Sequence, residues 1–166
     1  TLTNKTDVPM TLTVLDGIPE LIPYGINMHC MKNMTQTAKA WMQVIDAGTP
    51  VTGFRVRASM EDTSEMSEIT GAHFAAACDE SGAALPLVTD PALIFGLDDS
   101  YRVPEAFFDS DQPLRPETGR LSNFIPACFA LSAFTLQPGQ SHTQWLMIGA
   151  TEDKPFADRL CAKVMN

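Results

Sequence analysis

Apolar and polar residues alternate along most of this chain, and turn-forming residues interrupt the alternation about every ten residues. The clearest example runs from Phe54 to Ser59, where Phe54, Val56 and Ala58 alternate with polar neighbours. A period of two places successive side chains on opposite faces of a strand, whereas a helix needs a period near 3.6. The chain is therefore expected to be all-β, an antiparallel β-sandwich with a short C-terminal helix.

Strands are expected wherever this alternation holds. They are residues 1–4, 10–14, 38–45, 54–58, 72–78, 85–88, 124–136 and 141–149. The first two are expected to form a hairpin joined at Lys5-Thr6-Asp7 and ended by a turn at Asp16-Gly17. Strands 72–78 and 85–88 are expected to pair about the turn at residues 79–82. Pro138 followed by Gly139 suits the middle of a type II turn before the last strand.

Three stretches lack the alternation. Residues 18–25 contain Pro19, Pro23 and Gly25 and are expected to be irregular. Residues 28–35 are ambiguous, and a short helix is one possibility there. Residues 89–120 are rich in Pro, Gly and Asp, and such a long irregular segment is usually functional or packs on a neighbour.

The core is expected to lie between two sheets. Its predicted members are Phe54, Val56, Phe129, Leu131 and Trp145. Near the C-terminus, Pro155 is expected to open a short amphipathic helix. That helix would place on one side the apolar residues Phe156, Leu160 and Val164.

Length and charge limit the classes of partner. The 166 residues fit one domain, spanning residues 1–166. Twenty acidic residues against 11 basic ones give a net charge of −9, which repels phosphate groups. No apolar run approaches the roughly 20 residues of a membrane-spanning helix. A soluble domain without nucleic-acid or membrane partners is expected.

The cysteines and histidines are scattered. Neither residue type shows the close spacing that a zinc site needs. The positions are Cys30, Cys78, Cys128, Cys161, His29, His73 and His142. Apolar or small neighbours indicate buried free thiols, which favours a cytoplasmic setting over a secreted one; disulfides are the alternative. Because Thr1 already lies in a strand-like run, the chain is expected to be a piece of a larger protein.

The sequence holds no motif for independent catalysis. It lacks the nucleophile elbow, the phosphate-binding loop, the dinucleotide fingerprint and the zinc-protease motif. Its 20 acidic residues offer carboxylate pairs that any acidic protein would supply, so no catalytic residue is assigned. The runs Asp98-Asp99-Ser100 and Asp109-Ser110-Asp111 do not match the calcium-loop pattern and are expected to be solvated rather than to bind metal. No cofactor is expected.

Aromatic residues are the candidates for sugar binding, since sugars stack on flat π faces. Trp41 and Trp145 lie in expected strands and are assigned to the core. Tyr24 and Tyr101 lie in expected loops, which more often carry function. We hypothesise that Tyr101 and the pair Asp98–Asp99 face a neighbouring domain or a second subunit. The alternative is that residues 89–120 fold over one end of their own sandwich.

Four runs of the chain, at residues 14–25, 91–96, 104–107 and 136–141, resemble the N-terminal β-domain of large bacterial proteins similar to cellobiose phosphorylase. The most specific is residues 14–25, Val-Leu-Asp-Gly-Ile-Pro-Glu-Leu-Ile-Pro-Tyr-Gly, in which two Gly and two Pro fix an unusual backbone path. Weaker similarities lie at residues 91–96, 104–107 and 136–141. Together these runs span most of the chain.

The resemblance implies a β-supersandwich of the galactose mutarotase-like kind that precedes a helical linker and an (α/α) barrel. In such enzymes the catalytic acid and the phosphate site belong to the barrel, so no catalytic residue is carried over to this chain. The expected function is that of a non-catalytic domain of a glycoside phosphorylase- or hydrolase-like enzyme. It would contribute packing on the catalytic domain of the same parent chain, subunit contacts in a homodimer and contact with an oligosaccharide. The rival is an independent carbohydrate-binding module.

Overall fold

The fold is mostly β, with a few short helices. The computed structural model describes residues 1–59, 64–65, 69–109 and 113–152. Its strands are β1 (Leu2–Thr3), β2 (Met10–Ile18), β3 (Met42–Ile45), β4 (Thr52–Val56), β5 (Ala72–Asp79), β6 (Leu87–Val88), β7 (Cys128–Leu136), β8 (Ser141–His142) and β9 (Gln144–Thr151). Its helices are α1 (Met28–Asn33), α2 (Thr35–Trp41), α3 (Ala92–Phe95), α4 (Glu105–Phe108) and a 3₁₀ turn, η1 (Pro116–Thr118). The mostly-β prediction is confirmed, while the helix expected from Pro155 lies outside the described residues.

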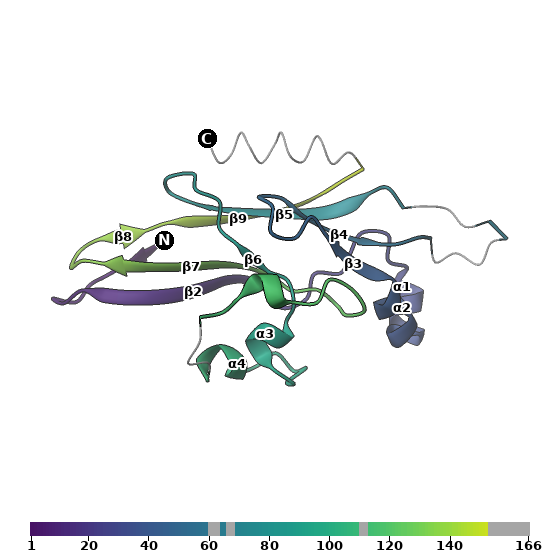
Figure 1. The fold of residues 1–166 in the computed structure, drawn as a ribbon, viewed down its shortest axis with the longest axis horizontal. Coiled ribbons are helices and arrows are strands. Elements are labelled where there is room, and N and C mark those ends of the chain that lie inside the picture. Colours follow the sequence, from purple (N-terminus) through teal and green to yellow (C-terminus); the bar gives the residue numbers. More distant parts are fainter. Residues whose placement is uncertain (60–63, 66–68, 110–112, 153–166) are drawn as a thin grey trace.

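The strands form three antiparallel sheets. The orders are β1-β8, β2-β7-β6 and β3-β4-β5-β9. Figure 1 shows the four-stranded sheet lying over the three-stranded one, with α1 and α2 at one end and α3 and α4 below the lower layer. The longest described helix has seven residues, so none of the described helices reaches the length that a membrane crossing needs.

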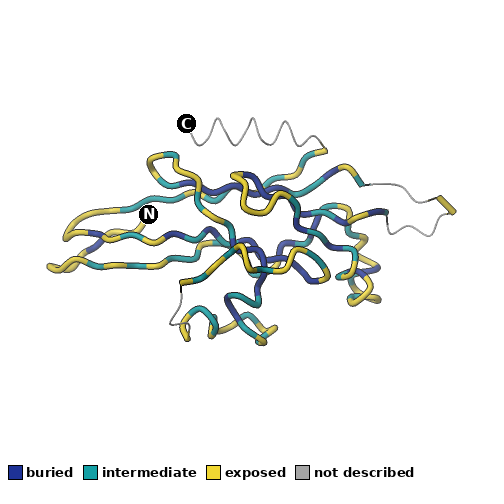
Figure 2. Tube along the Cα trace, viewed as in Figure 1, coloured by how far each residue is buried: buried dark blue, intermediate teal, exposed yellow. Residues whose placement is uncertain are grey.

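The main core lies between these two layers. Phe54 of β4 is completely buried and clusters with Val44 of β3 and Ala75 of β5. Cys128 of β7 and Leu87 of β6 face this cluster from the other sheet. Figure 2 shows the buried segments concentrated in the middle of the two layers. The predicted burial of Phe54 is confirmed, and so is that of Val56.

A second cluster covers the outer face of the three-stranded sheet. Val88, Ile94 and Phe95 are buried there, and Phe129 and Leu131 of β7 pack against them. The prediction that Phe129 and Leu131 lie between the sheets is therefore wrong. The alternation of β7 gives the inner face to Cys128 and its even-numbered neighbours. The 89–120 segment covers the opposite face.

The N-terminal hairpin prediction is also wrong. β1 pairs with β8, and β2 pairs with β7 along its whole length, from Met10 opposite Leu136 to Ile18 opposite Cys128. Gly17 is therefore part of a strand and not of a turn. Its missing side chain lets β7 approach closely, because a Cβ at this position would collide with the Cys128 carbonyl.

The turn at residues 79–82 forms as predicted, but the strands about it separate. Gly82 donates its amide to the Asp79 carbonyl (3.0 Å), and Leu85 donates to Ala77 (2.8 Å). Pro86 has no amide to continue this pairing. Its carbonyl accepts instead from Leu131 (3.0 Å), and β6 joins β7 in the other sheet.

The strand predicted at residues 38–45 is helical in its first half, residues 38–41, while residues 42–45 form β3. α1 confirms the open possibility of a helix after residue 28, and the Asn27 side chain caps it by accepting from the His29 amide (2.8 Å). α2 follows, ends at Trp41 and buries Ala38 completely. Apart from Trp41 and two Thr it consists of Ala, Gln and Lys, which favour helices, and tertiary packing selects the helix over the strand.

The last turn and the cysteines agree with the sequence analysis. Gln140 donates its amide to the Gln137 carbonyl (2.9 Å), and Gly139 has a φ of 78°, as a type II turn requires. Within the described residues the cysteines are buried free thiols, at positions Cys30, Cys78 and Cys128; Cys161 lies outside them.

The predicted burial of Trp145 is wrong, since this residue is 51% exposed on β9.

Candidate functional site

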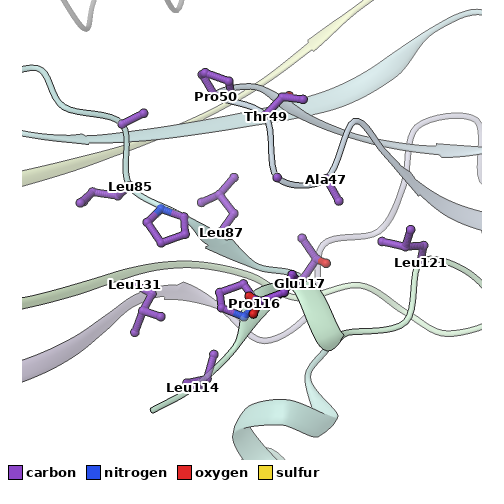
Figure 3. Close-up of a pocket in the computed structure, with 14 residues that line it drawn as sticks. Ala47, Thr49, Pro50, Leu85, Leu87, Leu114, Pro116, Glu117, Leu121 and Leu131 are labelled. Atoms are coloured by element: carbon purple, nitrogen blue, oxygen red, sulfur yellow. The ribbon is translucent and has the colours of Figure 1, made fainter.

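A cavity of about 600 Å³ opens at the free side of β6. Its walls come from four places in the sequence: the β3–β4 turn at residues 47–50, the connection at residues 84–89, residues 114–121, and Leu131 of β7. Figure 3 shows Leu87 near its centre, with Pro50 and Thr49 on one side and Leu131 and Pro116 on the other. The cavity is large enough for two or three side chains of a binding partner.

The lining is apolar and unusual in composition. It consists of Ala47, Gly48, Thr49, Pro50, Ala84, Leu85, Pro86, Leu87, Thr89, Leu114, Pro116, Glu117, Leu121 and Leu131. It contains no aromatic ring on which a sugar could stack, and Glu117 is its one charged side chain. Such a surface suits an apolar group with a basic neighbour better than it suits a carbohydrate.

An ion pair with a buried carboxylate fixes one wall of this cavity, since the Asp90 side chain is 5% exposed and that of Arg120 is 55% exposed. The Asp90 carboxylate is almost completely buried and accepts from Arg120 through Nη2 (2.7 Å) and Nε (2.8 Å). It also accepts from the backbone amides of Arg120 (2.9 Å) and Ala92 (3.0 Å). Gly119 passes so close that a Cβ would lie 3.0 Å from Asp90 Cβ. Asp90 and Arg120 thus clamp residues 114–121 to the start of α3.

The clamp determines the charge of Asp90. Burial by itself would raise the pKa of this carboxyl group, but the hydrogen bonds from Arg120 and the Ala92 amide outweigh burial and hold the pKa below its ordinary value. The Arg120 guanidinium also lies over the Phe124 ring, with Cζ 4.7 Å from the ring centroid. Asp90 is therefore ionised at neutral pH, and its ion pair with Arg120 holds the wall in place.

Tyr101 packs on its own domain. Its ring lies 5.1 Å from that of Phe95, within the cluster that covers β7. Its φ of 53° is one that aromatic residues rarely adopt. Burial, and then the charges of Glu20 and Asp99, raise the pKa of its phenol. This arrangement matches the alternative in which residues 89–120 fold over their own sheet, and the contact with another domain remains a prediction.

Asp98 and Asp99 shortly precede Tyr101 in the chain. Asp98 accepts hydrogen bonds within its own turn, including one from the Ser100 amide (2.9 Å). The bonds from Ser100 hold the pKa of Asp98 below its usual range. Asp99 is exposed. Across the described ranges no three His, Cys, Asp or Glu side chains gather closely enough to hold a metal ion.

Tyr24 lies elsewhere, beside β4 and β5. Its hydroxyl donates to Glu152 Oε1 (3.0 Å), and this hydrogen bond raises the pKa of the phenol. Its ring stands edge-on to His73 at 5.7 Å and fills the space above Gly71. Tyr24 therefore ties the end of β9 to the segment before α1, and the structure does not bring it together with Tyr101.

The buried thiols are unsuited to nucleophilic chemistry. Burial raises the pKa of Cys128 to about 12, so almost no thiolate exists at neutral pH. Burial also raises the pKa of Cys78, with a smaller contribution from Asp79. These cysteines act as small apolar core residues.

The sequence analysis missed the cavity and its clamp. Asp90 was one of several acidic residues in an irregular segment, and nothing in the sequence indicated Arg120 as its partner. One signal was present, since Pro86 between Leu85 and Leu87 interrupts strand pairing and leaves apolar side chains beside an open edge.

Replacing Tyr101 with Ala is expected to lower the free energy of unfolding by about 2 kcal/mol, because a half-buried ring leaves the cluster over β7. Urea denaturation measures this change. The control is Phe108→Ala, which removes a ring that is 70% exposed and should cost less than about 0.5 kcal/mol. An unchanged stability in Tyr101→Ala would show that the ring is not anchored on its own sheet.

Comparison with known proteins adds no identity, since no protein-family model and no curated protein matches this chain. Its function is therefore argued from the cavity, the clamp and the exposed side chains. A rigid apolar cavity with one carboxylate at its border can hold a partner's side chains. The lining contains one carboxylate, Glu117, and so supplies no pair of carboxylates for acid–base chemistry.

Proposed function

We propose that this chain is a non-catalytic domain of a larger cytoplasmic carbohydrate-active enzyme of the glycoside phosphorylase or hydrolase type. In this proposal the antiparallel sheets are a β-sandwich of the supersandwich, galactose mutarotase-like kind. The resemblance of residues 14–25 to cellobiose phosphorylase-like proteins supports the assignment. The buried free thiols support a reducing compartment.

The observation that carries the proposal is the apolar cavity beside β6. It would receive a segment of the catalytic domain of the same parent chain, with leucine and proline side chains providing the contact. The net charge of −9, together with Glu117 in the lining, favours a segment that carries a basic residue next to its apolar ones. Because the Asp90–Arg120 clamp already orders one wall, docking would cost little additional ordering.

A second candidate function rests on Trp145. This side chain is 51% exposed on β9, and an exposed tryptophan on a sheet is the kind of platform that stacks on a sugar. It would make the chain a carbohydrate-binding module. Tyr24 and Tyr101 give this reading less support, because their rings are engaged by His73 and Phe95.

Leu121→Asp in the full-length gene product is expected to weaken docking of the two domains by about tenfold or more, because it places a charge in an apolar contact. Limited proteolysis of the interdomain connection measures the undocked population. The stability of the isolated chain should change little, since Leu121 is already 50% exposed. The matched control is Leu97→Asp, at an exposed leucine outside the cavity. Equal proteolysis of both variants would refute docking through this cavity.

Calorimetric titration of the isolated chain with cello-oligosaccharides separates the two candidates. The docking proposal expects no saturable heat and no turnover of cellobiose with phosphate. Saturable binding that disappears in Trp145→Ala would establish the second candidate in its place.

A further inference from the structure

β9 has an open strand edge in the part of the chain that the structure describes. β9 ends the order of the four-stranded sheet, with β5 on one side. On the other side β1 lies beside β8, with Leu2 opposite His142, and no described strand lies beside residues 144–150. Its eight residues, Gln-Trp-Leu-Met-Ile-Gly-Ala-Thr, contain no charge and no proline. Natural sheets usually protect such an edge with lysine, proline or a bulge, because an unprotected edge pairs with other strands.

The direction of the backbone groups along this edge follows from the neighbouring strand β8. Asn4 donates its amide to the Gln140 carbonyl (2.9 Å), so Gln140 faces β1. Thr143 donates its amide to Glu80 on the opposite side (2.8 Å). Because these groups alternate along an extended strand, the even-numbered residues of β9 present their amides and carbonyls to the open edge.

Two large apolar side chains of β9 are exposed. Trp145 is 51% exposed and Ile148 is 40% exposed, and they lie on opposite faces of the sheet. Gly149 lies on the same face as Trp145, and the Phe74 ring covers it so closely that a Cβ there would be 2.6 Å from Phe74 Cζ. The edge thus combines a bulky residue and a glycine four positions apart.

We propose that β9 pairs antiparallel with β9 of a second copy of this chain, about a two-fold axis at Met147. In this register Leu146 forms the hydrogen-bonded pair with Ile148 of the second copy, which uses the outward-facing even-numbered residues. Trp145 lies opposite Gly149 of the second copy and packs beside its Phe74 ring. The two four-stranded sheets become one continuous eight-stranded sheet.

Self-complementarity and charge identify the second copy as the occupant. A two-fold axis brings each large residue of β9 opposite a small or apolar one, so each copy supplies both halves of the contact. Two chains with a net charge of −9 repel each other, and this uncharged strand lets them approach without opposing carboxylates. This interface is separate from the cavity beside β6 and does not depend on its occupant.

Ile148→Lys tests the edge. Sedimentation velocity over a concentration series should show a monomer–dimer equilibrium for the unchanged chain and a dissociation constant raised by about tenfold or more in this variant. The matched control is Ile18→Lys, at an isoleucine of β2 that is 37% exposed, which should leave the constant within about twofold. A chain that stays monomeric throughout the series, or one whose dimer is weakened equally by both variants, would overturn the proposal.

Met147→Cys tests the register, in a Cys161→Ser background so that the remaining native thiols are the buried ones. Residue 147 faces its own copy in a non-hydrogen-bonded pair, where the Cα atoms lie about 4.5 Å apart, within the range of a disulfide. Mild oxidation should therefore link the two copies. Ala150→Cys is the control, since its two copies would be about 20 Å apart. Cross-linking of Ala150→Cys in preference to Met147→Cys would refute the two-fold arrangement.

Discussion

Replacing Asp90 with Ala is expected to lower the free energy of unfolding by about 3 kcal/mol. The substitution removes the acceptor for two Arg120 side-chain bonds and two backbone amides, and these donors would stay partly buried without a partner. Chemical denaturation at neutral pH measures the change. Hydrogen exchange should also quicken across residues 114–121, because the clamp holds that segment to α3.

Acidification provides an independent check of the same pair. The folded-state pKa of Asp90 lies below its ordinary value, so its ion pair stabilises the fold fully above the unfolded pKa near 3.9. This stabilisation is lost as the pH falls through the lower, folded-state pKa. The difference in unfolding free energy between the unchanged chain and Asp90→Asn should therefore shrink at acidic pH. A deficit of Asp90→Asn that stays the same from neutral to acidic pH would contradict the role of the clamp.

The sequence predicted the strands better than their partners. The alternation from Phe54 onward reports which side chains share a face, and β4 forms there. β5 also forms where a strand was predicted, although it is buried on both faces and does not alternate. It carries no information on which strand lies alongside. β1 and β2 were therefore assigned to one hairpin, although each pairs with a strand more than 110 residues away.

The predicted burial of Trp145, on the edge strand β9, was also wrong. Trp145 occurs in an alternating run, but it shares a face with Met147 and Phe74 and not with Leu146 and Phe54, so the prediction placed it on the wrong face of the sheet. Whether that face is covered depends on the neighbours of the strand, and β9 has a neighbour only on the β5 side in the described structure. Period alone cannot distinguish such an edge strand from a central one.

The candidate site could not be predicted from the sequence, for a related reason. Its walls come from residues 47–50, 84–89 and 114–121 and from Leu131, which become neighbours only when both sheets are assembled. Tyr24 and Tyr101 were preferred because loop aromatics often bind ligands. In the structure Tyr24 donates to Glu152 and Tyr101 packs on Phe95, so local packing engages both rings.

Gly17 explains why a turn was predicted inside β2. Asp followed by Gly is a common turn signal, because glycine readily adopts positive φ. A strand also uses glycine where another backbone must come close. At Gly17 the second reason applies, because the backbone of Cys128 and Phe129 occupies the space a side chain would need.

Gly17→Ala is accordingly expected to destabilise the chain by about 3 kcal/mol or more, since the obstacle is backbone that cannot rotate away and β2 must move from β7. Gly139→Ala is the informative comparison. That glycine has a φ of 78° and open space around it, so its substitution should cost only about 1 kcal/mol of backbone strain. Urea denaturation of both variants measures the difference, and hydrogen exchange should quicken along β2 in Gly17→Ala alone. Equal losses of stability would mean that β2 and β7 can separate at Gly17 without cost, contrary to the pairing of these two strands.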